Sequence, residues 1–338
     1  MTKNTAILKI EPLSLPWKTQ DPFIFCAYHF DKYPGGNTHL GPNSSLKGRN
    51  LGQDFAGIDN WNMYHGTRVP GFPEHPHSGF ETVTIVAKGM VDHSDSLGAN
   101  GRFGEGDVQW LTSGKGVQHA EMFPLLKEDS NPFELFQLWL NLPKKSKKVA
   151  PYYKMLWRDD IPIITEKDEE DKVTYINLVA GTFRDKLAPA STPDSWAADP
   201  NNHVQIWTFK MEANATFTLP LINEDVTRSL YYYKGNSFTI EETTIKENHL
   251  VELAANEETK ITNGSKEGSF LFLQGRPINE PILQYGPFVA NTRNDLQETM
   301  LEYQRTHFGG WPWASSDPVH DKLRGRFSKT PDGQEVMK

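Results

Sequence analysis

Two short motifs carry the side chains best suited to chemistry: His-Pro-His at positions 75–77 and His-Ala-Glu at positions 119–121. Both lie in stretches with the composition of β-strands, where residues two apart point to the same face of a sheet. Each motif therefore presents two ligand-type side chains together, His75 with His77 and His119 with Glu121. Three imidazoles and one carboxylate suit a borderline transition metal and not Ca²⁺ or Mg²⁺, which prefer oxygen ligands.

The spacing of the motifs along the chain also favours a metal centre. His75 and His119 are 44 positions apart, which suits two strands facing each other across the interior of one barrel. Pro76 removes a backbone donor, so its strand is expected at a sheet edge or barrel rim. Four protein ligands leave two positions open on a six-coordinate metal but close a zinc site. We therefore predict redox chemistry with one divalent transition metal, Fe(II), and Ni, Mn, Cu, Co or Zn as alternatives.

The sequence around both motifs resembles the signature of the pirin family, metal-binding two-domain members of the cupin superfamily. The resemblance lies in the segments that flank the histidines and in landmarks spread along the chain in the family's order. These segments are residues 21–30, 71–84, 92–98, 104–121, 136–143 and 279–293. The acidic middle of the chain and the C-terminal tail lie outside the resemblance.

Two features depart from the pirin pattern. Ser78 stands where the family usually has an arginine after the second histidine, which removes a charge at the mouth of the pocket. The segment from Pro34 to Gly71 is longer than in typical members. We expect it to act as a lid over the metal, with His65 near the substrate; a packed surface insertion far from the metal is the alternative.

The pirin resemblance implies that the metal ligands are His75, His77, His119 and Glu121. General cupins carry a ligand glutamate a few residues beyond their first histidine pair, and Glu81 occupies that register. Positions 77 and 81 differ by an even number, so the strand period permits either carboxylate. The resemblance favours Glu121 and leaves Glu81 a supporting or structural role beside the ligands.

The other histidines are not predicted to bind metal. His93 lies between Asp92 and Asp95, and carboxylates beside an imidazole more often form a hydrogen-bond network than a ligand set. His203 and His249 have no second ligand two residues away. The second half of the chain is therefore expected to be metal-free, as the resemblance also implies.

Short runs of β-branched and aromatic residues, separated by glycine, proline and asparagine, dominate both halves of the chain. Residues 293–305 show helical spacing after a capping Asn291 or Thr292. The pattern predicts an all-β protein with a late helix, and the resemblance implies two tandem cupin barrels (double-stranded β-helix, or jelly-roll). The predicted divisions are a metal-binding cupin domain at 1–150, a connecting segment at 151–202, a second cupin domain without a metal motif at 203–290, and a C-terminal helix and tail at 291–338.

The amino-acid composition limits which binding partners and which cellular compartment are expected. A net charge of −8 and a pI near 5.8 argue against direct nucleic-acid binding, which needs a basic face. The sequence has no run of 18 apolar residues and no secretory leader, so no membrane association is expected. Its single cysteine, Cys26, cannot form an internal disulfide. We expect a cytoplasmic monomer in which Cys26 is buried and structural.

For function, the resemblance points to quercetin 2,3-dioxygenase chemistry. The metal would lower the pKa of a flavonol 3-hydroxyl, and Glu121 would take its proton as general base. Dioxygen would then add to the ring, releasing carbon monoxide and a depside. The predicted partners are a small aromatic, flavonol-like substrate and O₂. Some of five aromatic and thioether side chains are expected to form an apolar wall for the substrate, and roughly two-thirds of such residues to be core instead: Phe80, Trp110, Met122, Phe136 and Trp139.

Two alternative functions remain open. Some pirin-like proteins are redox-responsive cofactors that dock on a protein partner. The resemblance therefore also implies a metal-binding regulatory or protein-interaction module without catalytic turnover. The other alternative is a different metal-cupin enzyme, such as an isomerase, which would consume no oxygen.

Overall fold

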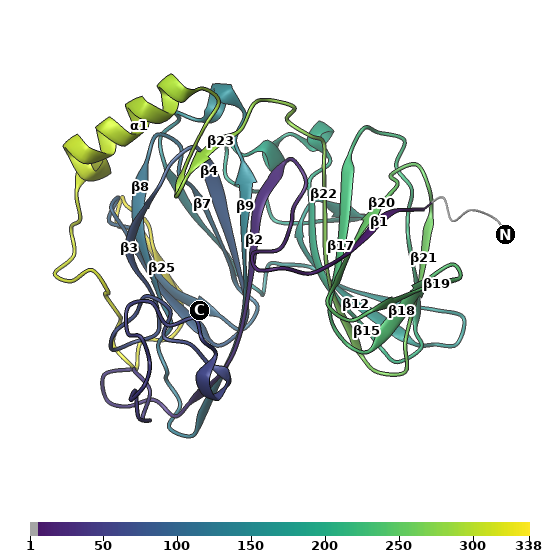
Figure 1. The fold of residues 1–338 in the computed structure, drawn as a ribbon, viewed down its shortest axis with the longest axis horizontal. Coiled ribbons are helices and arrows are strands. Elements are labelled where there is room, and N and C mark those ends of the chain that lie inside the picture. The colour runs from purple at the N-terminus through teal and green to yellow at the C-terminus, as the bar shows by residue number, and fades with distance from the viewer. Residues whose placement is uncertain (1–5) are drawn as a thin grey trace. The chain divides into compact units, whose positions relative to one another are not determined.

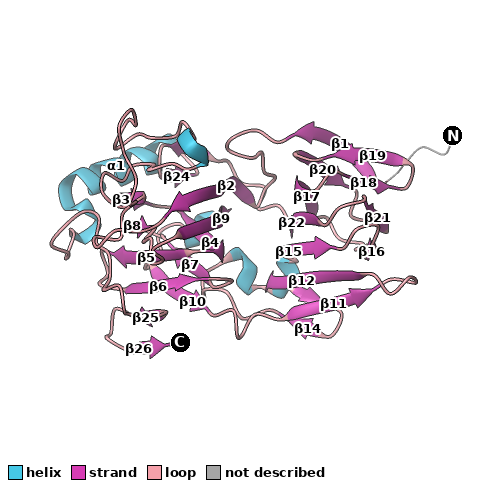
Figure 2. Ribbon diagram, turned by 90° about the horizontal axis from the view of Figure 1, so that it is seen from below, coloured by secondary structure: helices cyan, strands magenta, loops and turns pink. Residues whose placement is uncertain are grey.

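Residues 6–338 are described in the computed structural model of the chain, and strands dominate them (Figures 1 and 2). Strands take 46% of the residues and helices 9%, so the predicted all-β class with one C-terminal helix is confirmed. Residues 1–5, which begin the predicted first domain, lie outside the described residues. Among the helices in 6–338, none combines the length and the apolar character that a membrane crossing requires.

The described chain forms two compact units. The histidine unit comprises Ala27–Arg158 and Glu280–Lys338, and it contains both histidine motifs. The second unit comprises Met1–Cys26 and Asp159–Asn279. Each unit is therefore built from two separate parts of the sequence.

Two antiparallel sheets form the histidine unit. The first sheet has the strand order β10 (Tyr152–Leu156), β7 (Val108–Thr112), β4 (Phe80–Lys88), β9 (Ser130–Asn141) and β2 (Phe23–Pro34). The second sheet has the order β26 (Glu335–Met337), β25 (Phe327–Lys329), β6 (Asn100–Gly104), β5 (Met90–Asp95), β8 (Val117–Met122) and β3 (Gly71–His77). The remaining elements are η1 (Ile58–Asn60), η2 (Lys144–Ser146), the pair β23 (Leu283–Tyr285) and β24 (Phe288–Ala290), α1 (Arg293–Thr306) and η5 (His307–Gly309).

The second unit also has a larger and a smaller sheet. The larger sheet has the order β1 (Ile7–Pro12), β20 (His249–Leu253), β17 (Thr227–Lys234), β22 (Gly268–Gly275), β15 (Gln205–Met211), β12 (Val173–Ala180) and β11 (Ile163–Lys167). The smaller sheet has the order β16 (Thr216–Leu219), β21 (Thr259–Asn263), β18 (Ser237–Ile240) and β19 (Thr243–Lys246). The hairpin β13 (Thr182–Phe183) and β14 (Lys186–Leu187) and the turns η3 (Trp196–Ala198) and η4 (Pro200–Asn202) complete the unit. Apolar side chains from both sheets fill its core, among them Leu230, Phe270 and Ile261.

The observed units differ from the predicted divisions because strands pair over long distances in sequence. At the N-terminus, β1 pairs with β20 and so joins the second unit. The predicted connecting segment, 151–202, instead contributes strands to both units, since β10 pairs with β7 and β12 pairs with β15. At the C-terminus, β25 pairs with β6, which returns the tail to the histidine unit.

The C-terminal helix begins and ends close to its predicted bounds. Thr292 is its N-cap, and its side-chain hydroxyl accepts a hydrogen bond from the backbone N–H of Asp295 at 3.1 Å. The helix runs to Thr306, and His307 follows in a left-handed conformation that ends it. Figure 1 shows α1 along one end of the histidine unit, beside β23.

Candidate metal centre

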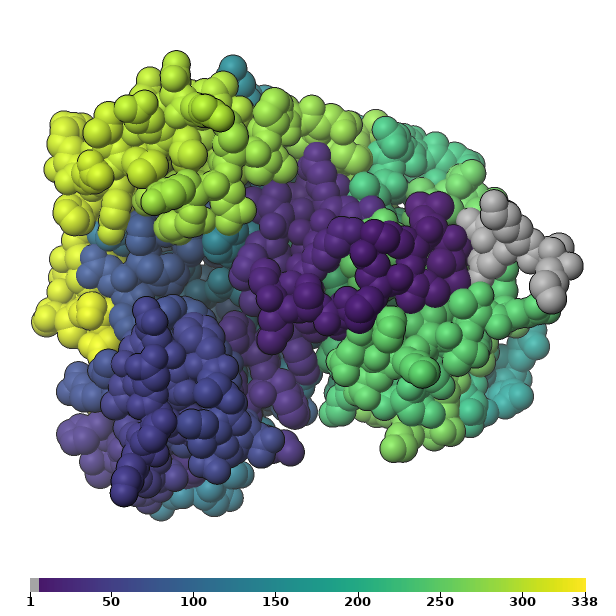
Figure 3. All heavy atoms as spheres, in the orientation of Figure 1, coloured from purple at the N-terminus to yellow at the C-terminus, as the bar shows by residue number. Residues whose placement is uncertain are grey.

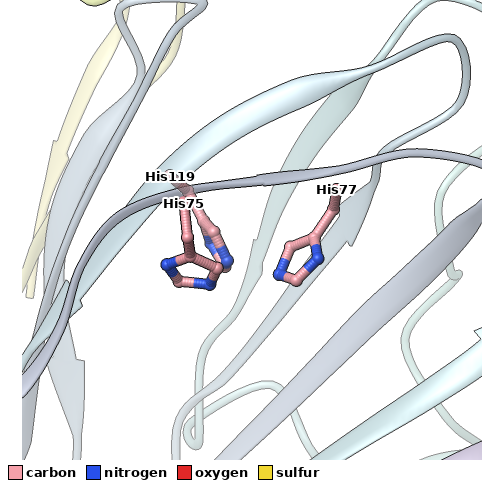
Figure 4. A group of neighbouring side chains, drawn as sticks. All are labelled: His75, His77 and His119. Carbon is pink, nitrogen blue, oxygen red and sulfur yellow. The ribbon is translucent and has the colours of Figure 1, made fainter. Parts of the chain in front are cut away.

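Two neighbouring strands position the three histidines. β3 and β8 pair antiparallel with His75 directly opposite His119, and His77 lies two residues further along β3. Because side chains two apart share a face, all three imidazoles project from the same side of the sheet. Figure 4 shows the three rings together on that side. One ring nitrogen from each histidine lies within 4.8 Å of the others, so the three side chains could hold a metal ion once the rings move slightly closer.

Burial keeps these imidazoles neutral. It lowers the pKa of His75 to about 4 and the pKa values of His77 and His119 well below their usual range. A neutral imidazole is the form that binds a metal. The Nδ1 atom of His75 lies 2.8 Å from the carbonyl oxygen of Pro73, which leaves Nε2 to face a ligand. At neutral pH, no proton has to leave these rings before a metal binds.

The residues present also fit a metal because His119 is otherwise unsatisfied. Its side chain is completely buried, and neither ring nitrogen has a hydrogen-bond partner among residues 6–338. A buried polar atom without a partner costs about 1–3 kcal/mol. A metal ion bound to His119 would satisfy one of its two ring nitrogens, so the donor set and its burial fit the predicted chemistry.

Glu121 lies beside the histidine cluster and reaches toward the facing sheet. Its Oε2 is 3.7 Å from Nε2 of His119. Thr84 of β4 donates a hydrogen bond to Oε1 at 3.0 Å, and Gln137 of β9 donates to Oε2 at 2.6 Å. Burial raises the pKa of Glu121, and these two hydrogen bonds oppose the rise. The structure thus places the predicted carboxylate next to the imidazoles, and its role as a ligand stays a prediction.

Glu81 lies on the opposite face of its strand from the site. The expectation that positions 77 and 81 share a face was wrong, because β3 ends at His77 and β4 begins at Phe80. The turn between them breaks the alternation of one continuous strand. Thr84 reaches Glu121, so Glu81, three residues earlier in β4, faces away from it. Its Oε1 accepts a hydrogen bond from Thr112 at 2.6 Å, which fits the structural role predicted for it.

His93 forms a buried network behind His119. Its Nε2 lies 3.1 Å from Oδ2 of Asp95, and its ring stacks on Tyr153 with 5.1 Å between centroids. The ring of His93 is 5.6 Å from that of His119, but His93 is not part of the compact cluster. Trp313 donates a hydrogen bond to the carbonyl of Asp95 at 2.8 Å. This arrangement matches the hydrogen-bond network predicted around His93.

Two residues of the predicted apolar wall lie beside the cluster. The rings of Phe80 and Trp139 stack with centroids 4.2 Å apart, and they lie 5.1 and 5.4 Å from the ring of His77. Because Phe80 and Trp139 come from β4 and β9, the facing sheet supplies this aromatic surface. It lies within reach of a planar ligand at the metal position.

The other predicted wall residues are buried elsewhere. Phe136 precedes Gln137, so the strand alternation turns it away from Glu121, and it packs on Tyr28 at 4.8 Å. Trp110 is opposite Val83, which alternates with Thr84 and therefore faces the same outer side. Met122 packs with a separate apolar cluster. Trp110, Met122 and Phe136 are therefore core residues and not part of the wall. Apolar composition alone does not tell which face of a strand a residue occupies.

The segment predicted as a lid packs on the histidine unit through aromatic rings. Phe55 contacts the rings of Tyr64 and His65 at 5.5 and 5.1 Å. Both of these contact Phe72, at 5.3 and 5.5 Å, and Phe72 lies 6.3 Å from His75. Figure 3 shows the dark blue to purple residues of this segment gathered on the visible face. The segment therefore connects to the site by contact, while its action as a lid stays a prediction.

The polar partners of Glu121 were missed in the sequence. Thr84 and Gln137 looked like ordinary residues of apolar strands, yet both point to the interior. Gln109 lies opposite Thr84 in β7 and is fully buried, and neither its amide oxygen nor its nitrogen has a hydrogen-bond partner in the described part of the chain. Polar residues at interior positions of buried strands are the signal that could have found all three.

The paired double sheets, with a histidine cluster in one of the units, define a protein of the cupin class with a candidate metal site. The family model for pirin matches residues 44–140, and the model for the pirin C-terminal cupin domain matches residues 206–309. The chain belongs to the pirin family.

Known proteins resemble the chain over most of its length. It is 35% identical to a pirin-like protein from Solanum lycopersicum over 237 residues, 69% of this chain and 75% of that protein. It is 31% identical to pirin from Homo sapiens over 251 residues, 73% of this chain and 80% of that protein. The crystal structure of a quercetin 2,3-dioxygenase from Acinetobacter baumannii matches with a TM-score of 0.71 at 27% identity, covering 90% of this chain and 98% of that one.

Proposed function

We propose that the chain is a metal-dependent dioxygenase that resembles quercetin 2,3-dioxygenase and opens the ring of a flavonol with O₂. The observation that supports the proposal is the convergence of two buried imidazoles and one half-buried imidazole, all neutral, with a carboxylate. An aromatic surface of Phe80 and Trp139 lies beside them. The likeness to a solved quercetin 2,3-dioxygenase supports the same chemistry.

The metal would be held by His75, His77, His119 and Glu121. Fe(II) is the proposed ion, since three nitrogens and one oxygen with open positions suit oxygen chemistry. When bound, the metal supplies a positive charge that acidifies the flavonol 3-hydroxyl, together with the redox capacity to activate O₂. The remaining steps fall to the side chains of this chain.

Glu121 is the proposed proton acceptor. Its pKa is raised by burial, so its carboxylate holds a proton more readily than an exposed glutamate does. The proton of the flavonol 3-hydroxyl would move to Oε2, the oxygen nearer His119. Gln137 and Thr84 fix the orientation of the carboxylate through their hydrogen bonds. The buried surroundings exclude water from the deprotonated substrate.

The aromatic pair would orient the substrate. Phe80 and Trp139 are stacked with an interplanar angle of 27°, and both rings approach His77 edge-on. A planar flavonol that packs against this pair would direct its oxygen atoms to the metal position.

The test follows quercetin in air and under nitrogen. The purified chain, loaded in turn with Fe(II), Ni(II) or Mn(II), is incubated with quercetin while the flavonol absorbance is recorded. We expect loss of absorbance in air alone, with carbon monoxide released, and no loss in Glu121→Gln. If the flavonol absorbance is not lost with any of the metals, the proposed dioxygenase activity is refuted. Equal loss under nitrogen would point to an isomerase or another reaction that needs no oxygen.

A second candidate is a metal-binding regulatory module that docks on a protein partner. The deep burial of His77, His119 and Glu121, none more than 3% exposed, favours it because a bulky substrate has a narrow approach. In that case the chain would bind metal tightly and leave quercetin intact. The same experiment therefore separates the two functions.

A further inference from the structure

A cavity lies in the histidine unit, outside the candidate metal centre. It has a volume of about 850 Å³, within the usual range for small-molecule sites. Its walls are α1 on one side and the loop that contains η2 on the other, with the end of β24 and the turn before β8 between them. Ser78 lines it, directly after His77, but neither the three histidines nor Glu121 belongs to its described lining.

One wall of this cavity carries an unusual density of positive charge for an acidic chain. Lys115, Lys144, Lys147 and Lys148 all line it, although the net charge of the chain is −8. Lys147 is only 7% exposed, and its ammonium donates hydrogen bonds to the carbonyl of Gly79 at 2.9 Å and to Oδ1 of Asn141 at 2.7 Å. The structure thus fixes one charge in the wall, while the other three lysines are exposed around it.

The wall formed by α1 carries side-chain oxygen atoms that can accept hydrogen bonds from the hydroxyl groups of a ligand. Asp295, Glu298, Thr299, Glu302 and Thr306 line this side, on one face of α1.

Two of these helix carboxylates already have cationic partners. Glu298 pairs with Lys148 at 2.9 Å, and Glu302 pairs with Arg305 at 2.6 Å. Asp295 forms part of the helix cap with Thr292. In contrast, Lys115 and Lys144 have no ion-pair partner within residues 6–338. Glu302 attracts Lys115 only at longer range. The cavity therefore presents two ammonium groups without a close ion-pair partner, together with a row of hydroxyl and carboxylate oxygens on α1.

From this distribution we infer that the cavity binds a polyhydroxylated organic anion, a sugar phosphate or a sugar acid. The anionic group would lie against the exposed Lys115 and Lys144, where charge-assisted hydrogen bonds are strong. The ligand's hydroxyl groups would donate to Asp295 and to the carboxylates further along α1. An inorganic anion alone would fill only a small part of the cavity volume. A neutral sugar would bring no negative charge to pair with the lysine ammonium groups.

The test is calorimetric titration of the full-length chain with four probes. Glucose 6-phosphate and gluconate combine hydroxyl groups with a phosphate or a carboxylate, whereas inorganic phosphate and glucose each supply one half of the recognition. We expect one or both of the organic anions to bind at least tenfold more tightly than inorganic phosphate or glucose. The organic anion that binds more tightly shows whether the cavity prefers a phosphate or a carboxylate. Absence of binding by both, or equal binding of inorganic phosphate, would overturn the inference.

Lysine variants locate the binding. The Lys115→Gln/Lys144→Gln double variant should weaken the organic anion about tenfold or more, as expected for lost charge-assisted contacts. Lys144→Gln alone is compared with Lys145→Gln, which removes the same single charge from the neighbouring exposed position outside the cavity lining. The Lys145→Gln variant should leave affinity within twofold, and equal weakening by the two single variants would show nonspecific attraction and refute the site. All three lysines are exposed, so metal content and melting temperature should match the parent chain.

Discussion

Two opposing effects act on the pKa of Glu121. Burial raises its pKa, and the hydrogen bonds from Thr84 and Gln137 stabilise the ionised carboxylate and lower it. The net direction is upward. Such a group can be ionised beside a metal and still accept a proton from a substrate, which are the two tasks proposed for it.

Replacing Gln137 by leucine should weaken metal binding without removing a ligand. The change deletes the 2.6 Å hydrogen bond to Oε2 of Glu121 and leaves that oxygen unrestrained. Removal of a group that orients a metal ligand typically costs about tenfold or more in affinity. Competition with a chromogenic chelator measures the dissociation constant. Gln304→Leu, on the exposed side of α1, is the control, and an unchanged constant in Gln137→Leu would show that the hydrogen bond does not position Glu121.

At the scale of elements, the segment between Pro34 and Gly71 is held by a buried ion pair. Arg49 donates a hydrogen bond to Oδ2 of Asp54 at 2.8 Å, and both side chains are 1% exposed. Arg49 also donates to the backbone carbonyl of Trp61 and lies 3.3 Å over its ring. The segment is therefore anchored from within. Deleting residues 41–52 would remove Arg49, so point substitutions test the segment more cleanly.

Arg49→Met should destabilise the chain strongly because it leaves Asp54 buried without its cation. Breaking a buried pair by removing one partner costs about 3–5 kcal/mol. Arg68→Met is the matched control, since the side chain of Arg68 is 72% exposed and its nearest carboxylate lies at 3.8 Å; it should cost less than about 1 kcal/mol. Denaturant unfolding followed by tryptophan fluorescence gives both values. Similar values for the two variants would mean that the segment is only loosely attached.

Asp31 of β2 gives the attachment of this segment a pH dependence. Burial raises the pKa of Asp31 to about 6, although its carboxylate accepts hydrogen bonds from Asn62 and Tyr64. The folded chain then binds this proton more tightly than the unfolded chain does, so the contribution of Asp31 to stability falls as the pH rises from about 4 to 6. A shift of about 2 units corresponds to about 3 kcal/mol.

Asp31→Asn isolates this effect, because the amide keeps the shape and cannot ionise. The stability difference between the parent chain and the variant should move by about 3 kcal/mol against the parent between pH 4 and pH 7. Denaturant titrations at both pH values provide the measurement. A constant difference would show that the carboxyl group titrates normally in the folded chain.

At the scale of the whole molecule, the C-terminal tail supports the sheet that carries the site. β25 pairs with β6, and the buried Arg102 of β6 forms an ion pair with Asp92 at 2.6 Å. The guanidinium of Arg102 also donates to the backbone carbonyls of His320, Asp321 and Arg324. Residues far beyond the pirin-like landmarks therefore hold the strands next to β8.

Features that depend on residues close together in the sequence could be predicted without a structure. Residues two apart in a strand share a face, so His75 and His77 could be placed together without a structure. The alignment of β3 with β8 could only be guessed, since it depends on a pairing across 44 positions. Glu81 was misplaced because a two-residue turn resets the alternation. The two compact units differ from the predicted divisions for a related reason, since strands such as β1 and β25 pair with partners more than two hundred positions away.

The second unit offers internal controls for the metal centre. His203 and His249 lie there, and His249 forms a hydrogen bond through Nδ1 with the carbonyl of Glu247 at 3.0 Å. Neither belongs to the histidine cluster in residues 6–338. Substituting them should therefore change neither metal content nor flavonol turnover.

Elemental analysis of the purified chain and its alanine variants tests the central claim most directly. The parent chain, His203→Ala and His249→Ala should each contain about one transition-metal ion per chain, the number that one four-ligand cluster holds. Each of four single alanine variants should lose that metal: His75→Ala, His77→Ala, His119→Ala and Glu121→Ala. The Glu81→Ala variant should retain it. Full metal content in the histidine variants, or loss of metal in His203→Ala or His249→Ala, would contradict a single centre at the cluster between β3 and β8.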